Sequence, residues 1–279
     1  MSYLLKAMIN RAAQEKADQT TLDEQQEKVN EVRDLVGGSV AAEMASFLSD
    51  GTIRRFLRAR NWSTEQATKA LRETVKWRRQ YRPDTICWED IAEREDEARR
   101  VYIADYRDTA GRAVFVSKSS IKCKTSVKEQ IKQLVYNLEI LANSSDGEQE
   151  EESVVWLTDF RGWTLTTTPL SLARESICIV QNHYPGLIAL AILSNPPRIF
   201  ESFWKIVRHF IEARLKERAK FVYTDSPESH RIVADMFDLD KLEAAFGGRN
   251  TAAFDMDKYA ARMKRADQAR GASNGGRSK

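Results

Sequence analysis

The chain of 279 residues carries 44 Lys and Arg against 41 Asp and Glu, so its formal net charge is only +3. So small a charge, with both signs mixed along the chain, argues against a nucleic-acid partner. No run approaches the roughly 18 to 20 apolar residues of a membrane-spanning helix. The three cysteines, Cys87, Cys123 and Cys178, are isolated. Free thiols in a reducing compartment, and hence a cytoplasmic protein, are expected.

Residues 1–98 are expected to form an all-helical N-terminal subdomain. Its first 50 residues are polar and helical in pattern, with a break at Gly37 and Gly38. Ser63 stands three residues before Gln66, the spacing of a capping box that starts a helix. Apolar residues at helical spacing then continue this helix to about Tyr81.

The hydrophobic period changes from about residue 99. Alternating segments flank a turn at Gly111 and predict a β-hairpin. The rest alternates between strand-like and helical patterns, which is typical of parallel crossover units. We therefore predict an α/β fold, with a mostly parallel sheet flanked by helices, over residues 99–255. Residues 256–279 are expected to be a basic tail that frays after about Tyr259. The segments that follow the hairpin are a helix at 126–142, a strand at 154–160, a helix at 169–184, a strand at 188–195, a helix at 195–211, a strand at 220–225 and a helix at 227–238.

The sequence offers no motif for bond chemistry. GxGxxG, GxxxxGK[ST] and GxSxG are all missing, and no two histidines stand at metal-ligand spacing. Asp159 and Asp225 end predicted strands, where α/β enzymes often place acids, although capping of the next turn is the favoured explanation. We therefore expect a binding protein rather than an enzyme, with no metal and no cofactor.

The segment from Asn195 to Ile211 has an unusually wide apolar face. Its apolar side chains span an arc of roughly 160° on a helix, whereas a surface helix needs only about 100°. A neighbouring helix, an oligomer interface or an apolar ligand could cover the extra width. In the third case the helix is a lid that can also lie on a membrane surface. The apolar side chains are Ile199, Phe200, Phe203, Trp204, Ile206, Val207, Phe210 and Ile211.

Five segments, in order between about residues 50 and 250, resemble the CRAL-TRIO, or Sec14-like, lipid-binding family. They are IRRFLRARNW, VVWLTDFRGW, QNHYPGLIALAILSNPPRIFESFW, KFVYTD and LDKLEAAFGGRN. The ending is most similar to small plant or fungal members without an extra module. The resemblance implies an apolar lipid cavity above the sheet and a gating helix at 195–211. It also implies a protein that transfers or presents one bound lipid, as its only ligand, without bond chemistry.

The resemblance also implies site residues. Arg60 and Lys220 match two head-group positions of phosphatidylinositol-binding members, and we add His183 and Tyr184 as head-group candidates. The acyl chains are expected to lie against eight apolar side chains. These are Phe115, Trp156, Leu190, Ile192, Phe200, Phe203, Trp204 and Val207.

The chain departs from the family's head-group patterns at four positions. Asn61 stands where phosphatidylinositol-binding members have Lys, and Gly186 stands where they have Glu. Val154 and Trp156 replace the small hydroxyl residues of phosphatidylcholine-binding members. We therefore place phosphatidylinositol or another anionic phospholipid first, and a neutral sterol or isoprenoid second.

Two hypotheses of a different kind stand beside a lipid carrier. One is an α/β enzyme with Asp159 or Asp225 as its base, and the other is a protein-interaction module. The expected partner of a lipid carrier is a membrane surface, contacted transiently and peripherally by a monomer. The basic tail offers further cations for an anionic membrane. They are Lys258, Arg262, Lys264, Arg265, Arg270, Arg277 and Lys279.

Overall fold

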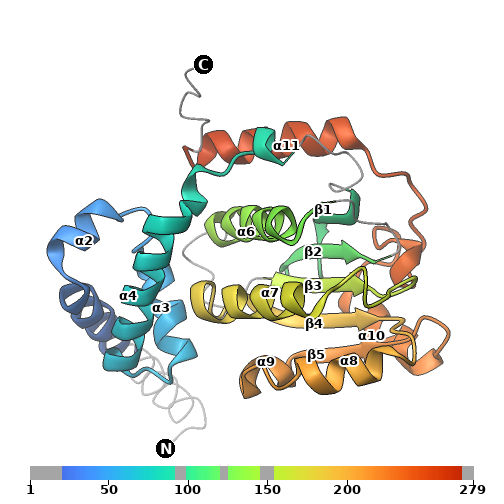
Figure 1. Ribbon diagram of the computed structural model, residues 1–279, viewed down its shortest axis with the longest axis horizontal. Helices are drawn as coiled ribbons and strands as arrows, with labels where there is room; N and C mark the ends of the chain where they lie inside the picture. The colour runs from blue at the N-terminus through green and yellow to red at the C-terminus, as the bar shows by residue number, and fades with distance from the viewer. Residues whose placement is uncertain (1–20, 92–98, 120–124, 145–153, 272–279) are drawn as a thin grey trace, which may run out of the picture. The chain divides into compact units, whose positions relative to one another are not determined.

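The computed structural model describes residues 21–91, 99–119, 125–144 and 154–271 (Figure 1). It contains two compact units, one up to Lys76 and one from Trp77 onward. The division falls inside helix α4 (Thr64–Tyr81), upstream of the domain boundary predicted at residue 98. Each unit has its own elements and core.

Unit 1 is helical throughout its described part, as predicted. Gly37 interrupts the helical run with a φ of 105°, a backbone conformation that glycine adopts without strain. The Ser63 hydroxyl accepts a hydrogen bond from the Gln66 N–H at 3.3 Å, so the predicted cap of α4 is confirmed. Buried side chains such as Val29, Ile53 and Phe56 form the core of this unit. Its helices are residues 21–36, α2 (Gly38–Glu43), α3 (Asp50–Ala59) and most of α4.

Unit 2 is built on a five-stranded sheet in the order β1-β2-β3-β4-β5. β1 and β2 form the predicted antiparallel hairpin, and the remaining neighbours are parallel, as the strand–helix alternation predicts. The register places Phe115, Trp156, Ala191 and Ala219 in one row across four strands. The strands are β1 (Val101–Arg107), β2 (Ala113–Lys118), β3 (Val154–Asp159), β4 (Ile188–Ser194) and β5 (Ala219–Val222).

Helices cover both faces of this sheet. Figure 1 shows α6 and α7 side by side over one face, with α8 and α9 next to β5. Side chains of the opposite face, such as Val116 and Leu157, belong to a core cluster that also contains Val233 and Phe246 from the C-terminal part of the chain. The helices are α6 (Val127–Ser144), α7 (Leu170–His183), α8 (Phe200–Val207), α9 (Ala213–Glu217), α10 (Pro227–Met236) and α11 (Met256–Ala269), with short 3₁₀ turns η1 (Pro83–Thr85), η2 (Trp88–Asp90) and η3 (Ala244–Phe246).

The helix predicted to reach Ile211 ends earlier. α8 stops at Val207, and the chain turns before α9. The side chain of Gln181 on α7 fixes this turn, because it donates to the Phe210 carbonyl (3.1 Å) and accepts from the Glu212 N–H (2.6 Å). An apolar period cannot report such a tertiary contact, so the sequence overstated the length of the helix.

The prediction of a frayed tail is wrong for residues 256–269, which form α11. Tyr259 and Met263 are buried in the core of unit 2. The Asp267 carboxylate, also buried, accepts from the Trp88 N–H (2.6 Å) and the Tyr136 hydroxyl (3.2 Å). The exposed side of α11 is rich in basic residues, so the sequence did not indicate the narrow apolar stripe by which this helix packs on the core.

A buried ion pair joins the end of α4 to α6. The Arg78 guanidinium donates to both oxygens of Glu139 at 2.7 and 2.9 Å, and the Tyr184 hydroxyl donates to the same carboxylate at 2.6 Å. Burial opposes ionisation of Glu139, but the bonds and charge of Arg78 outweigh it and hold the pKa of Glu139 below its usual value. The carboxylate is therefore charged and fully bonded.

We predict that Glu139→Gln destabilises the fold by about 3–5 kcal/mol, because the Arg78 charge stays buried without its counter-ion. Urea denaturation followed by circular dichroism measures this change. The control is Glu73→Gln, which breaks the exposed Glu73–Lys76 pair and is expected to leave the stability close to that of the wild type. Similar losses in both variants would contradict a structural role for the buried pair.

Candidate functional site

Unit 2 contains a cavity of about 270 Å³ between its sheet and its helices. The row formed by Phe115, Trp156, Ala191 and Ala219 is its floor. α7 and α8 supply most of the apolar wall, with side chains that recur at helical spacing. These wall residues are Leu172, Ala173, Ile177, Val180, Phe200, Phe203, Trp204 and Val207.

Most of the side chains predicted to contact acyl chains line this cavity, but Leu190 and Ile192 do not. On β4 the lining residues are Ile188, Ala191 and Leu193. Leu190 and Ile192 point to the opposite face of the sheet, because successive strand residues alternate sides. Both are buried in the core of unit 2. The run IALAILS is apolar at nearly every position, so the sequence contains no signal for which residues face the cavity. The predicted residues that do line it are Phe115, Trp156, Phe200, Phe203, Trp204 and Val207.

The apolar arc of α8 divides between the cavity and the outside. Phe200, Phe203 and Val207 are buried, whereas Ile199 and Ile206 are 59% and 51% exposed. The extra width of the predicted stripe therefore faces outward, and the inner side covers a void rather than a solid core.

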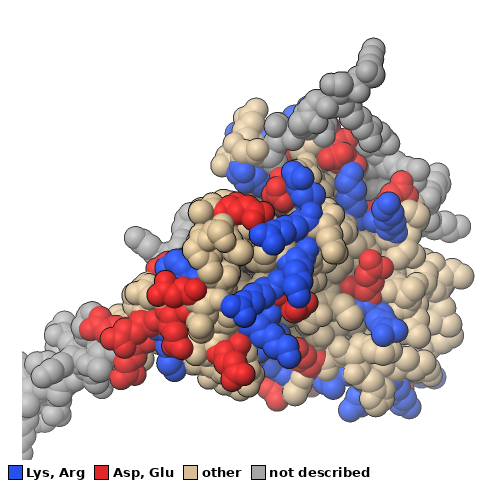
Figure 2. All heavy atoms as spheres, turned by 60° about the vertical axis from the view of Figure 1, so that its left-hand side comes forward, with Lys and Arg blue, Asp and Glu red and all other residues tan. Residues whose placement is uncertain are grey.

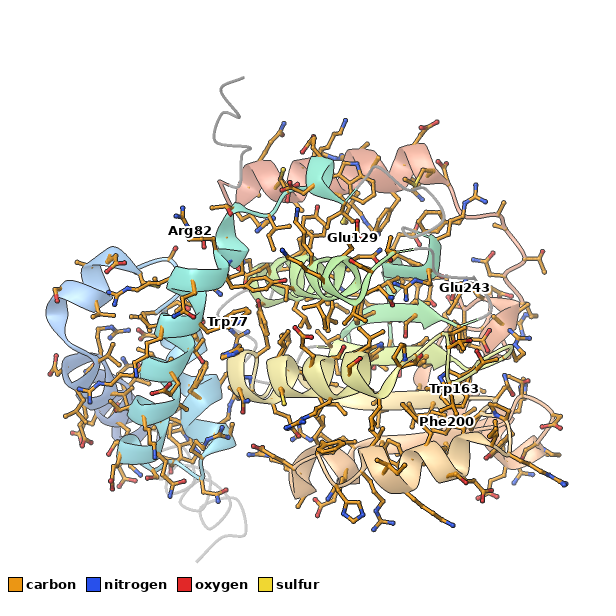
Figure 3. All side chains as sticks on the ribbon, viewed as in Figure 1. Trp77, Arg82, Glu129, Trp163, Phe200 and Glu243 are labelled. Carbon is orange, nitrogen blue, oxygen red and sulfur yellow. The ribbon has the colours of Figure 1, made fainter. Side chains whose placement is uncertain are left out.

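Aromatic contacts hold the inner side of α8 in place. The Trp163 ring lies 5.1 Å from the Phe200 ring and 5.0 Å from the Phe203 ring, and Phe160 lies 4.3 Å from Phe200. Figure 3 shows Trp163 and Phe200 next to each other. Phe160 and Trp163 belong to the loop after β3, whereas the other two rings belong to α8. These contacts therefore join α8 to that loop. Edge and tilted contacts of this kind are favourable geometries for aromatic rings.

Two of the predicted head-group residues, both cations, are not in the cavity wall. Lys220 is exposed on β5, and its partner in the register is Ile192, so it lies on the face of the sheet opposite the cavity. Arg60 belongs to unit 1, where it ends α3 and donates to the Ala59 carbonyl at 3.2 Å. The cavity itself is formed by unit 2 alone.

His183 and Tyr184, the remaining head-group candidates, also lie outside the cavity wall. The His183 ring stacks on Trp77, with centroids 4.1 Å apart and planes at 7°. Burial, with a smaller effect from the Arg78 charge, lowers the pKa of His183 to about 4. Tyr184 is occupied by its bond to Glu139. Both side chains serve the packing between α4 and α7.

A polar group of residues near the end of β3 was not predicted from the sequence. The Ser117 and Thr158 hydroxyls lie 3.0 Å apart on neighbouring strands, and the Trp156 indole N–H donates to Ser117 at 3.1 Å. All three line the cavity. Ser117 and Thr158 stand two residues after Phe115 and Trp156, so the period of two already placed them on the same face.

The candidate base Asp159 is held by the following turn. Its carboxylate accepts from the Arg161 N–H at 3.1 Å and from the Arg161 guanidinium at 2.9 Å. Asp225 is exposed. In the described residues, no three His, Cys, Asp or Glu side chains gather as metal ligands.

No helix in the described part of the chain is both long and apolar enough to cross a membrane.

Exposed cations recur along α4, at Lys69, Arg72, Lys76 and Arg79. Figure 2 shows a band of Lys and Arg side chains on the face of the molecule that it presents, with Asp and Glu beside it. Glu73 pairs with Lys76, and the Leu35 carbonyl accepts from Arg72, so part of this charge is already engaged.

The family model for the CRAL/TRIO domain matches residues 98–248, more than half of the chain. The chain belongs to the CRAL/TRIO family. The match spans the sheet, α6 to α10 and the whole wall of the cavity, so the lipid-binding resemblance of the sequence segments is confirmed at the level of the family.

Curated relatives share this CRAL/TRIO region at low identity. The phosphatidylinositol transfer protein PDR17 of Saccharomyces cerevisiae is 27% identical over 205 residues, which cover 69% of this chain and 57% of that protein. The SEC14 cytosolic factor of Candida glabrata is 25% identical over 226 residues, 75% of this chain and 74% of that protein. The crystal structure of Sfh5 matches with a TM-score of 0.66 at 14% identity, covering 85% of this chain and 91% of that one, and supports the predicted fold.

We predict that His183 makes the stability of the protein depend on pH below neutrality. The folded protein keeps this ring neutral down to about pH 4, whereas an unfolded chain protonates it near pH 6.5. The contribution is therefore complete above about pH 6.5 and is lost as the pH falls toward 4. Since the ring is only half-buried, we expect a loss of about 2 kcal/mol.

Urea denaturation at several pH values between 7 and 4 tests this dependence. His183→Phe keeps an aromatic ring on Trp77 and should flatten the profile. His209→Gln, at an exposed position after α8, is the matched control and should leave the profile unchanged. Identical profiles for all three proteins would show that His183 titrates normally.

Proposed function

We propose that this protein binds a single phospholipid, phosphatidylinositol or another anionic phospholipid, in the cavity of unit 2 and transfers or presents it between membranes. The observation that carries the proposal is the division of α8 into an inner side that covers a void and an outer side that exposes isoleucines. The printed name of the PDR17 relative, a phosphatidylinositol transfer protein, supports the same ligand class.

The physical reason for a lid of this kind lies in the cost of wetting hydrocarbon. Each lipid methylene exposed to water costs about 0.8 kcal/mol. A carrier must therefore offer its ligand a wall about as apolar as the bilayer, and the wall contributed by α7 and α8 meets this requirement. The aromatic contacts of Trp163 hold α8 in this wall.

The cavity of about 270 Å³ lies near the lower end of ordinary ligand pockets. We infer that it expands when a diacyl lipid enters, by displacement of α8 from Trp163 and Phe160. α8 ends at Val207, where the chain turns, and its outer side is exposed. The function involves binding and release, with no bond chemistry and no cofactor besides the lipid.

Lipid extraction from gently purified protein, followed by mass spectrometry, tests the function directly. We expect about one phospholipid per protein molecule, with an anionic head group. A sterol or isoprenoid in its place would support the neutral-ligand hypothesis. Protein that stays free of lipid after incubation with vesicles would contradict the proposal.

We predict that Ala191→Trp abolishes lipid uptake without unfolding the protein. Ala191 stands in the floor of the cavity, and an indole there fills the space that a chain would occupy. Lipid extracted per protein molecule is the measurement. The control is Ala234→Trp, on the exposed side of α10, which should load normally; equal loading by both variants would place the lipid elsewhere.

The outer side of α8 suits transient contact with a membrane. Ile199 and Ile206 are exposed, and the basic side chains of Arg198, Lys205 and Arg208 are exposed around them. Apolar side chains flanked by cations bind anionic lipid surfaces. The expected partner is therefore a bilayer, approached by a cytoplasmic monomer.

The basic tail contributes less to this surface than its sequence suggests. Lys258 pairs with Asp105 at 2.7 Å, and Arg270 pairs with Asp267 at 2.8 Å. Arg262 donates to the Ile103 carbonyl. Arg277 and Lys279 lie outside the described residues. We therefore assign membrane contact to α8 rather than to α11.

We predict that replacing both Ile199 and Ile206 by Ser weakens binding to anionic vesicles by about tenfold, since two half-exposed isoleucines lose their burial in the bilayer. Co-sedimentation with vesicles measures the affinity. Leu35→Ser, which removes a leucine 44% exposed in unit 1, is the control and should bind as the wild type does. Unchanged binding by the double variant would exclude α8 as the contact.

A further inference from the structure

The end of the cavity near the carboxyl ends of β2 and β3 is polar. In the register of the sheet, Val101 stands beside Ser117 and Ser117 stands beside Thr158, and all three line the cavity. In an α/β sheet, ligands commonly bind beyond the carboxyl ends of the parallel strands. This row of residues, which the family resemblance did not supply, therefore bounds a place suited to the polar group of a ligand.

The start of α6 lies against the same row. Gln130 follows Glu129, which Figure 3 labels on this helix, and it lines the cavity. About one turn further along, the Gln133 side chain donates to the Val101 carbonyl at 3.3 Å. This bond ties the first turns of α6 to the edge of the polar row, so Gln130 and the hydroxyl residues belong to one end of the cavity.

Gln130 carries an open acceptor at this end. The residue is only 9% exposed, and its amide nitrogen donates to the Thr125 carbonyl at 3.2 Å. Because a carbonyl can only accept, this bond fixes which end of the amide is the oxygen. That oxygen is buried and has no partner in the described chain. Buried acceptors are normally satisfied, so this oxygen is suited to a donor within the cavity.

The hydroxyls of Ser117 and Thr158 leave one donor for the same place. The two oxygens lie 3.0 Å apart, so one of their two hydrogens is used in the bond between them. The Trp156 indole N–H gives its own hydrogen to Ser117 at 3.1 Å. Among the described residues neither hydroxyl makes another hydrogen bond. The remaining hydroxyl hydrogen can therefore be donated to a ligand.

The charges around the cavity distinguish a hydroxyl from an ammonium as the matching group. No Asp or Glu is among the described residues that line the cavity, whereas Arg100 lines its polar end. An ammonium of the ligand would lose water there without gaining a counter-ion. A hydroxyl carries no charge, and it both donates and accepts. It matches the open acceptor of Gln130 and the remaining donor of the hydroxyl pair.

We propose that this polar end binds an uncharged hydroxyl of the lipid, which donates to the Gln130 amide oxygen and accepts from the Ser117–Thr158 pair. The inference rests on the proposed function and narrows its ligand to a lipid with a free hydroxyl at its polar end, such as a polyol head group. Selection then depends on a hydrogen bond rather than on Lys220 and Arg60, which lie outside the cavity wall. Choline has no hydroxyl and no N–H, so the same site disfavours phosphatidylcholine.

The first test uses the wild-type protein and two phospholipids of equal charge. Phosphatidylglycerol and phosphatidylethanol each carry a single negative charge, but only phosphatidylglycerol has free hydroxyls in its head group. The protein is incubated with phosphatidylcholine vesicles that contain both lipids in equal amounts and is then re-isolated, and its lipid is identified by mass spectrometry. We expect about tenfold enrichment of phosphatidylglycerol, because phosphatidylethanol leaves the acceptor of Gln130 unsatisfied.

The second test removes the acceptor. Gln130→Leu keeps a side chain of similar size without the amide, and we expect its uptake of the two lipids to become nearly equal. Gln268→Leu makes the same change at an exposed position of α11 and should keep the wild-type preference within about twofold. Melting temperatures show whether each variant is folded, and Gln130→Met takes the place of the leucine variant if that protein is unfolded.

The outcomes separate this inference from the proposed function. Equal uptake of the two lipids by the wild type, or an unchanged preference in a folded Gln130 variant, would overturn the hydroxyl assignment and leave lipid carriage intact. If the wild type takes up no lipid from any vesicle, the proposed function itself fails. A further arm offers cholesterol and its deoxy analogue, cholestene. Uptake of cholesterol alone, in place of phospholipid and lost in Gln130→Leu, would support the hydroxyl site and contradict a phospholipid ligand.

Discussion

The contact between α8 and the aromatic rings that follow β3 is the interaction on which the rest of unit 2 depends. Trp163 and Phe160 pack against Phe200 and Phe203 and fix α8 to the loop after β3. The inner side of α8, held in this way, forms part of the apolar wall above the floor of the sheet.

The cavity is divided into two chemically different parts by the course of the strands. Where β4 and β5 contribute, the floor is built from Ala191 and Ala219, and the wall from aliphatic side chains. Where β2 and β3 end, the hydroxyls of Ser117 and Thr158 replace them. The lining therefore changes from apolar to polar along the sheet.

The structural role of His183 and Tyr184 illustrates how a position can be misassigned. Both stand beside the Tyr-Pro segment that carries family resemblance, yet they bind Trp77 and Glu139 rather than the cavity. The Tyr184 hydroxyl bonds to the buried ion pair of Arg78 and Glu139, which joins the end of α4 to α6. The His183 ring packs the end of α7 on α4. The ion pair thereby fixes the end of α4 on α6.

The sequence by itself determined the order of elements, the parallel sheet, the hairpin and the family, because period, caps and motifs are local properties of the chain. It also predicted that side chains of α8, together with Phe115 and Trp156, line a cavity, and they do. The tertiary structure alone decided which side of β4 faces the cavity, where α8 stops, and that α11 packs on the core. A uniformly apolar strand has no readable side, and the turn after α8 is held by Gln181, which lies 29 positions from Phe210. Within the described residues, the open acceptor of Gln130 likewise arises only when distant segments meet, since satisfaction of a polar group is a property of its surroundings.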